Sequence, residues 1–160
     1  MKYEEKDTES APKTVDLFIG LQAAFTINRF NKKVKANPTY KNVFRKLPIL
    51  LTSSHKDSSN NYSKKLGVKN AGSGHGLVEA KKDKSVFCTA TWSPTMHKPL
   101  NQECTKEYKD KVVVLDVSLI LDGCYTKDCT FKVDSHNDVF DMDMGHVINY
   151  SLENMLKDKQ

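Results

Sequence analysis

The sequence predicts an α+β fold in which one long N-terminal helix packs on an antiparallel sheet of four to six strands. Apolar residues recur at helical spacing early in the chain, and short runs rich in β-branched and aromatic residues follow them. The connections between these runs are short enough for hairpins. At 160 residues the chain is expected to form one domain with a sizeable core.

The helix is expected from Thr14 to Lys35. Thr14 is a suitable N-cap residue, and Leu17 and Leu21 begin an apolar stripe at spacings of three and four residues. Pro38 is expected to end the helix, because proline disfavours the helical conformation of the residue before it.

The strands are expected after this helix, with Val112–Leu121 at the centre of the sheet. Pro48 assigns the segment from Tyr40 to Thr52 to an edge strand or a bulge. Val112–Leu121 is the longest apolar run. Thr130–Asp134 is expected to be the hairpin partner of the central strand. A short helix is expected over Gly145–Lys157. The other expected strands are Leu77–Ala80, Ser85–Trp92 and Val139–Met144.

The domain boundaries follow from composition. Residues 1–13 are charged and unpatterned, which predicts a mobile arm, and residues 14–160 form the domain. The polar stretch from Ser53 to Gly76 is expected to be a long functional loop or an extended hairpin. Its end, Gly72–Gly76, lacks the Gly-Lys-Ser/Thr ending of a phosphate loop and is interpreted as a linker or a hairpin tip.

Four cysteines suit two disulfides, with three connectivities open. Cys124 and Cys129 are close enough in sequence to close a hairpin, and Cys88 and Cys104 could close a second loop. Four free thiols in a cytosolic protein are the alternative. Zinc binding is not expected, because the spacing is loose and no second close cysteine pair exists.

The positive charge is concentrated in one half of the chain. The net charge is +5, and the segment from Arg29 to Lys84 holds 14 basic residues against 3 acidic ones. Only two of the 25 basic residues are arginine, which weakens a sequence-specific nucleic-acid interpretation but remains compatible with a polyanion. No apolar run is long enough to span a membrane, so no membrane partner is expected.

Two parts of the chain resemble the cystatin superfamily, which includes the cathelicidin pro-domain. The segment LQAAFTINRFNKKVKANPTYKNV is similar to the cystatin helix and its entry into the next strand. KVVVLDVSLILDGC at 111–124 and DCTFKVD at 128–134 resemble the later strands, of which the first ends at a cysteine and the second opens with one. The resemblance implies a cystatin-like fold and a secreted protein.

The inhibitory motif of that family is missing. Classical cystatins block papain-like proteases with a Gln-x-Val-x-Gly hairpin, and the corresponding residues here, 106–110, read KEYKD. The Pro-Trp pair of the second hairpin is absent after Val133. Transfer of the fold is therefore expected, whereas transfer of the inhibitory wedge is not.

No group of residues predicts catalysis, so the chain is expected not to be an enzyme and to need no cofactor or metal. His136 lies among several aspartates, and a solvated acidic turn is the interpretation adopted for it. The residues expected to contact a partner are the apolar group in TWSPTM and lysines of the basic stretch, and two Asn-x-Ser triplets are glycosylation candidates. These residues are Trp92, Pro94, Met96, Lys64, Lys65, Lys69, and the asparagines Asn61 and Asn149.

The function predicted is that of a secreted, disulfide-stabilised binding protein acting by protein–protein contact, as a divergent cysteine-protease inhibitor or an immunomodulator. The N-terminus has no signal peptide, which fits either a mature secreted chain or a cytoplasmic protein. One alternative is a module that binds a heparin-like or nucleic-acid polyanion through residues 29–84. Another is an intracellular accessory or adaptor protein. The partner's identity and the oligomeric state are left open.

Overall fold

The computed structural model describes residues 17–30, 48–57, 60, 62, 67–101, 104, 111–121 and 142–156. These residues form a mixed five-stranded sheet with the order β1-β2-β5-β3-β4. The strands are β1 (Phe18–Gly20), β2 (Ile49–Ser53), β3 (Phe87–Ser93), β4 (Lys98–Pro99) and β5 (Val112–Asp116). All neighbours pair in parallel except β3 and β4, which pair antiparallel.

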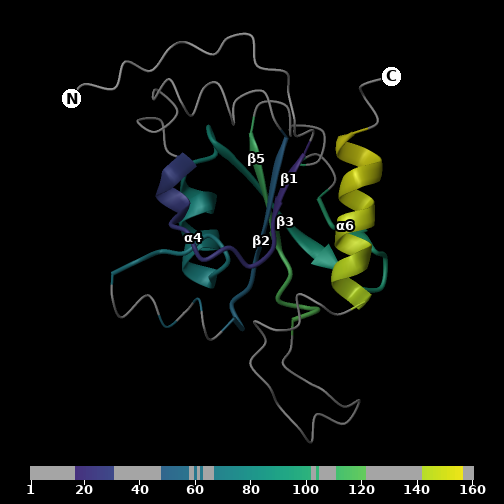
Figure 1. Cartoon of the computed structure of the whole chain (residues 1–160), viewed down its shortest axis with the longest axis horizontal. Coiled ribbons are helices and arrows are strands. Elements are labelled where there is room, and N and C mark those ends of the chain that lie inside the picture. Colours follow the sequence, from purple (N-terminus) through teal and green to yellow (C-terminus); the bar gives the residue numbers. More distant parts are fainter. Residues whose placement is uncertain are drawn as a thin grey trace, which may run out of the picture.

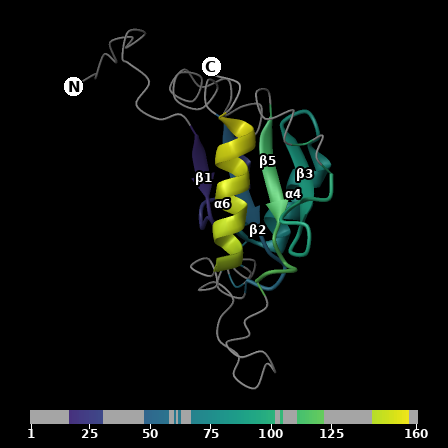
Figure 2. The same ribbon diagram turned by 90° about the vertical axis from the view of Figure 1, so that its right-hand side faces the viewer.

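Helices cover both faces of this sheet. Helix α4 (Gly74–Lys82) and the 3-10 helix η1 (Ile27–Phe30) lie on one face, and helix α6 (Met142–Met155) lies on the other (Figure 1; Figure 2). Among the described residues, no helix has the length and apolar character needed to span a membrane.

The two faces of β5 build two separate apolar clusters. Val113 and Leu115 pack on the side of α6, whereas Val112 and Val114 pack on the side of α4 and η1. All four are at most 3% exposed. Strands that are buried on both faces carry apolar residues without alternation, which explains the continuous apolar run in this part of the sequence.

The predicted central strand is confirmed in its position but is shorter than expected. β5 lies between β2 and β3, with Val114 beside Leu51 of β2 and beside Thr89 of β3. The strand ends at Asp116, and a turn follows in which Val117 accepts hydrogen bonds from the backbone N–H groups of Ile120 and Leu121.

The predicted N-terminal helix and the antiparallel sheet are wrong. The structure places strand β1, a turn and the 3-10 helix η1 within Thr14–Lys35, whose ends at 14–16 and 31–35 lie outside the described residues. Gln22, in the turn, has a left-handed φ of 45°, which an α-helix does not accommodate. The apolar residues of β1 and the following turn pack against both apolar clusters. Their spacing along the sequence is therefore the same as that of an apolar stripe on one helix.

Other expected elements differ in type or position. Leu77–Ala80 belongs to helix α4 rather than to a strand, and β2 lies inside the sheet, with Pro48 just before its first residue. The expected strand Ser85–Trp92 is confirmed as β3. The expected C-terminal helix is confirmed as α6, which begins at Met142 and so replaces the end of the strand expected over 139–144. The expected strand Thr130–Asp134 lies outside the described residues.

Replacement of Leu115 by Ala tests the position of β5. Leu115 is fully buried on the side of α6, so L115A is expected to lower the free energy of unfolding by about 2–5 kcal/mol. Leu119 in the following turn is 56% exposed, and L119A is the matched control, with an expected change within about 0.5 kcal/mol. Chemical denaturation measures both, and equal effects of the two substitutions would contradict the described core.

Candidate functional site

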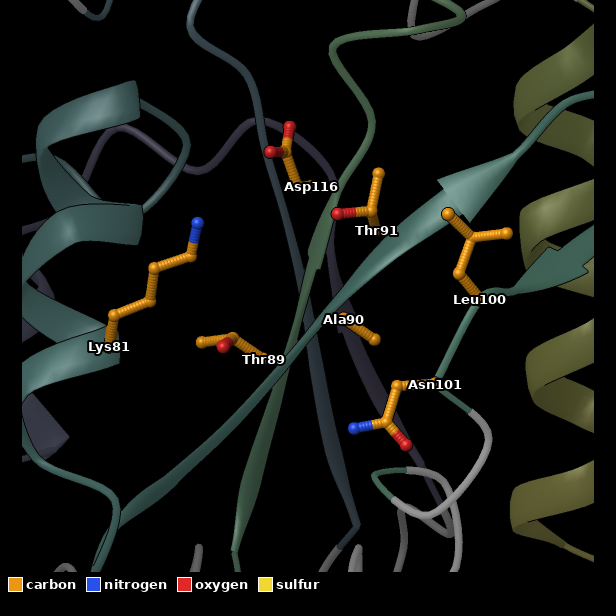
Figure 3. Close-up of a pocket in the computed structure, with 7 residues that line it drawn as sticks. All are labelled: Lys81, Thr89, Ala90, Thr91, Leu100, Asn101 and Asp116. Atoms are coloured by element: carbon orange, nitrogen blue, oxygen red, sulfur yellow. The ribbon is translucent and has the colours of Figure 1, made fainter.

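A groove lies between helix α4 and the β3–β4 end of the sheet, beside the carboxyl end of β5. Its volume is about 270 Å³. Lys81 reaches into it from α4, and Leu100 and Asn101 lie on its opposite side (Figure 3). Thr89, Ala90 and Thr91 of β3 and Asp116 of β5 form the remaining lining. The groove thus runs from the middle of β3 to the carboxyl end of β5, and ligands of parallel sheets with helices on both faces typically bind near this edge of the sheet.

The alternation of β3 puts two hydroxyl groups in this groove. Phe87 packs in the cluster beneath α4, and Thr89 and Thr91 follow it at intervals of two residues on the same face. Ala90 belongs to the cluster on the opposite face. Within the part of the chain that the structure describes, neither threonine hydroxyl has a hydrogen-bond partner. Both hydroxyls are therefore able to donate to, or accept from, a ligand.

Asp116 is held in place by the turn that follows β5. Its Oδ1 accepts the Ser118 hydroxyl at 2.6 Å and the Ser118 backbone N–H at 3.1 Å. Its Oδ2 lies 4.0 Å from Nε2 of His55, and the side chain of Asp116 is 14% exposed. The register places Asp116 directly beside Thr91. The carboxylate is thus fixed through Oδ1, and Asp116 lines the groove beside Thr91.

His55, Ser118 and Asp116 do not form a nucleophile activated by a base. The Ser118 hydroxyl donates to Asp116 and accepts the backbone N–H of His55 at 2.9 Å, so no described bond joins it to the imidazole. A catalytic serine would instead donate to the histidine. The three residues tie the end of β2 to the end of β5 and orient the carboxylate.

Lys81 carries a positive charge that no described residue neutralises. Its neighbours Lys69 and Lys82 both pair with Glu79, each with an Nζ to Oε1 distance of 2.8 Å. Lys81 has no such partner among the described residues, and its distance from Asp116 exceeds that of an ion pair. The groove therefore contains an ammonium that no described residue neutralises and a carboxylate that is held by Ser118 and lies 4.0 Å from the His55 imidazole.

The glycines of Gly72–Gly76 serve close packing at the start of α4. Ser73 caps the helix by accepting the backbone N–H of Gly76 at 3.1 Å. A Cβ atom on Gly72 would collide with the backbone of Gln22, and one on Gly74 with the ring of His55. The segment is the packed beginning of a helix and not a linker or hairpin tip.

A buried polar network supports this end of the sheet. The fully buried carboxylate of Asp57 accepts the backbone N–H of Asn60 at 2.8 Å and its side-chain amide at 2.8 Å. With its nitrogen toward Asp57, the Gln22 amide donates to Asp57 Oδ2 at 2.8 Å and to the Gly72 carbonyl at 2.9 Å. Three donors thus compensate the burial of this charge, and the network joins the turn after β1 to the loop before α4.

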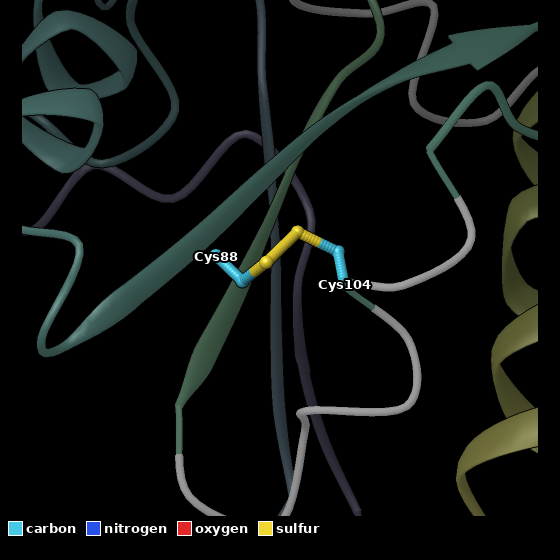
Figure 4. Close-up of a disulfide and its surroundings, with 2 residues drawn as sticks. All are labelled: Cys88 and Cys104. Atoms are coloured by element: carbon cyan, nitrogen blue, oxygen red, sulfur yellow. A yellow bond between two sulfur atoms is a disulfide. The ribbon is translucent and has the colours of Figure 1, made fainter.

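The cysteines of the sequence prediction divide into two pairs. Cys88 and Cys104 are joined by a disulfide, with a Cα–Cα distance of 5.3 Å (Figure 4). This pairing is one of those that the sequence left open. Cys124 and Cys129 lie outside the described residues.

The expected partner-binding residues do not gather in one place. Trp92 belongs to β3, is fully buried and packs edge-on against Tyr150 at a ring distance of 5.6 Å. Pro94 is half-buried and Met96 is exposed in the turn between β3 and β4. Lys69 is the lysine paired with Glu79. Lys64 and Lys65 lie outside the described residues.

The remaining candidates are glycosylation and metal sites. Asn149 is exposed on α6, but Ser151 of its triplet is fully buried and donates its hydroxyl to the Val147 carbonyl at 2.7 Å. Asn61 and His136 lie outside the described residues. Within the described residues, no group of three or more His, Cys, Asp or Glu side chains could hold a metal ion.

The sequence interpretation did not identify the residues that line the groove. Thr89 and Thr91 alternate with other residues in the sequence, and this pattern predicts a strand of an antiparallel sheet but no ligand groove. The proximity of Lys81 and Asp116 depends on β5 inserting between β2 and β3, which no local pattern specifies. Comparison of the chain with protein-family models, curated proteins and solved structures finds no match.

Replacement of Glu79 tests the charge arrangement on α4. Hydrogen bonds from Lys69 and Lys82 hold the pKa of Glu79 below its ordinary value of 4.5. The ionised carboxylate therefore favours the folded state above this pH, and the contribution is lost as the pH falls through the lowered pKa. We expect E79Q to reduce stability at pH 7 by less than about 1 kcal/mol, because the pairs are solvent-exposed.

Denaturation at pH 7 and at about pH 3 measures this difference, which is expected to shrink at the lower pH. Glu153, on the exposed side of α6, has no ion-pair partner among the described residues and provides the control E153Q. A difference between wild type and E79Q that is unchanged at low pH would contradict the assignment.

Proposed function

We propose that this chain is a binding protein whose groove takes a small molecule with an anionic group and several hydroxyl groups. The observation that carries the proposal is the lining itself. Lys81 and Asp116 face the same groove without pairing, and the Thr89 and Thr91 hydroxyls lie on the β3 face between α4 and β5.

The anionic group would bind at Lys81. Its ammonium is a flexible point charge with three donors, which suits a phosphate or a carboxylate. Lys82 competes less for the same ligand, since Glu79 already engages it. The anion is therefore expected on the α4 side of the groove.

The hydroxyl groups would bind along β3 and β5. Oδ2 of Asp116, which makes no described hydrogen bond within the chain and lies 4.0 Å from His55 Nε2, would accept hydrogen bonds from ligand hydroxyls, and the threonine hydroxyls would both donate and accept. A cavity of about 270 Å³ is just below the usual range for drug-sized ligands, so a compact polyol fits better than a larger molecule.

Binding is favoured over catalysis by the bonding of Ser118. Its hydroxyl is committed to Asp116, and the described residues around the groove contain no second nucleophile next to a base. The proposal therefore keeps the prediction that the chain is not an enzyme. Secretion also stays a prediction, with which a disulfide is compatible because disulfides persist in oxidising compartments.

Glycerol 3-phosphate is the probe for this proposal, with glycerol and inorganic phosphate as its two halves. In a titration followed by amide chemical shifts, we expect signals of Thr89, Thr91 and Asn101 to respond to glycerol 3-phosphate, and its affinity to exceed that of either half. K81Q is expected to weaken binding of glycerol 3-phosphate about tenfold, or about 1.4 kcal/mol. T91V is expected to weaken it less, by loss of one neutral hydrogen bond.

K84Q is the matched control, because Lys84 is exposed near the same helix but does not line the groove. Failure of all three probes to shift the groove signals would remove the proposal. Tighter binding of a free amino acid than of glycerol 3-phosphate would contradict a polyol ligand and would indicate a zwitterionic ligand instead.

A second candidate function is the binding of a polyanion. Lys81, Lys82 and Lys84 are all exposed at the end of α4, which gives this surface a local excess of positive charge. Retention on a heparin column is expected to fall steeply with salt and to weaken in a K82Q/K84Q chain. The glycerol 3-phosphate affinity of the same variant is expected to stay unchanged, which separates the two functions. Retention equal to that of the wild type would exclude this surface.

A further inference from the structure

Two histidines that are 49 positions apart in the sequence meet at the surface beside α6. His97 lies in the turn between β3 and β4, and His146 lies on α6. Their ring centroids are 4.1 Å apart, and the ring planes are tilted by 45°. His97 is exposed and His146 is half-buried. Within the part of the chain that the structure describes, neither imidazole forms a hydrogen bond or an ion pair, so their nitrogens are available to a ligand from solvent.

The turn holds His97 in an uncommon backbone conformation. The pairing of Ser93 with Lys98 closes this turn, and the Ser93 hydroxyl accepts the backbone N–H of Met96 at 3.2 Å. His97 has a φ of 48°, in the left-handed region that glycine adopts without strain. Other residues adopt this conformation at a cost in free energy, and such residues concentrate at binding and active sites. The conformation of His97 is therefore a second reason to look for a ligand here.

Packing between β3 and α6 fixes the two histidines relative to each other. Tyr150 lies one helical turn after His146, so both residues are on the same side of α6. The Tyr150 ring packs edge-on against Trp92, which is fully buried near the end of β3, at a ring distance of 5.6 Å. The end of β3 approaches α6 at this place (Figure 1). The two imidazoles are thus brought together by the fold and not by a local sequence motif.

The separation of the rings suits two imidazoles that share a transition-metal ion. Imidazole nitrogen binds Zn²⁺, Ni²⁺ and Cu²⁺, and for a given site the affinity is highest for Cu²⁺. With metal–nitrogen bonds of about 2.0 Å, two ring centroids lie about 4.5 Å apart in neighbouring positions of a square and about 5 Å apart in a tetrahedron. The observed 4.1 Å is closer to the square arrangement. The geometry therefore favours Cu²⁺, which prefers tetragonal coordination, over the tetrahedral Zn²⁺.

We propose that His97 and His146 together bind one Cu²⁺ ion, whose remaining coordination positions are filled by water. Among the described residues no third His, Cys, Asp or Glu joins the pair, so the site differs from a structural zinc centre with four protein ligands. The ion ties the β3–β4 turn to α6 and stabilises the folded chain, because only the folded state brings the two ligands together. The inference does not depend on the proposed function, since neither histidine lines the groove.

The test is a titration of the full chain with Cu²⁺, followed by amide signals. Cu²⁺ is paramagnetic and broadens the signals of nuclei near it. The amide signals of Lys98 and Gly145, next to the two histidines in the sequence, are expected to disappear first. Those of η1, on the opposite face of the sheet, are expected to stay sharp. Zn²⁺ is expected to bind at least about tenfold more weakly than Cu²⁺. Broadening that spares both Lys98 and Gly145 would overturn the proposal.

H97G and H146Q are the variants that remove one ligand each. Glycine adopts the left-handed φ of residue 97 without strain, and glutamine is a good helix former, so both chains are expected to fold. Each substitution is expected to weaken Cu²⁺ binding at least about tenfold, because one imidazole alone does not chelate the ion. The control is H75Q, which removes a histidine of α4 on the other face of the sheet and is expected to leave the Cu²⁺ affinity unchanged.

The thermal midpoint gives a second measurement on the same chains. Cu²⁺ is expected to raise the Tm of the wild type and of H75Q, and to leave that of H97G and H146Q unchanged. An affinity that falls in only one of H97G and H146Q would show binding by a single histidine and would overturn the shared site. If H146Q does not fold, H97G decides alone, and its binding Cu²⁺ like the wild type would overturn the proposal.

Discussion

The insertion of β5 between β2 and β3 is the constraint on which the rest of the structure depends. Its residues are buried on both faces, and they form the middle of both apolar clusters. Because β5 pairs in parallel with both neighbours, the carboxyl ends of the three strands lie at one edge of the sheet. Helix α4 covers one face and α6 the other, so polar groups gather where these strands end.

The groove is a consequence of this arrangement. On the face of β3 that is turned toward α4, the side chains change from the apolar Phe87 to the threonines Thr89 and Thr91. Asp116 reaches the same place because β5 ends beside Thr91, and the Ser118 turn holds its carboxylate. The segment after β4 closes the remaining side and is itself fixed by the Cys88–Cys104 disulfide. Helix α4, strands β3 and β5, and the segment after β4 thus surround a groove in which Lys81 and Asp116 do not form an ion pair with each other.

The sequence predicted the buried strands better than their directions. The alternating residues of β3 and the apolar run of β5 were strong enough to identify both strands, and the pattern after residue 144 identified α6. The direction of pairing of β5 was not predictable, because a strand buried on both faces shows no alternation that would distinguish a parallel neighbour from an antiparallel one. The segment from Phe18 to Phe30 misled the prediction for a related reason. Its apolar residues serve two clusters through a strand and a turn, and this produces the same spacing as one helical stripe.

The site was less predictable than the fold. Lys81 and Asp116 are 35 positions apart in the sequence, and only the crossover through α4 brings them to one groove. The aromatic residue that the sequence favoured for binding, Trp92, is instead a fully buried residue near the end of strand β3. The hydrophobic pattern alone cannot distinguish an exposed tryptophan in a loop from a buried one in a strand, because a tryptophan next to Ser-Pro fits a loop as well as the end of a strand.

A crystal structure of the oxidised chain grown with glycerol 3-phosphate tests the central claim most directly. The account predicts density for the ligand in the groove, with its phosphate near Lys81 and its hydroxyl groups near Asp116 and Thr91. An empty groove at saturating ligand, or a β5 that does not lie in parallel between β2 and β3, would contradict it.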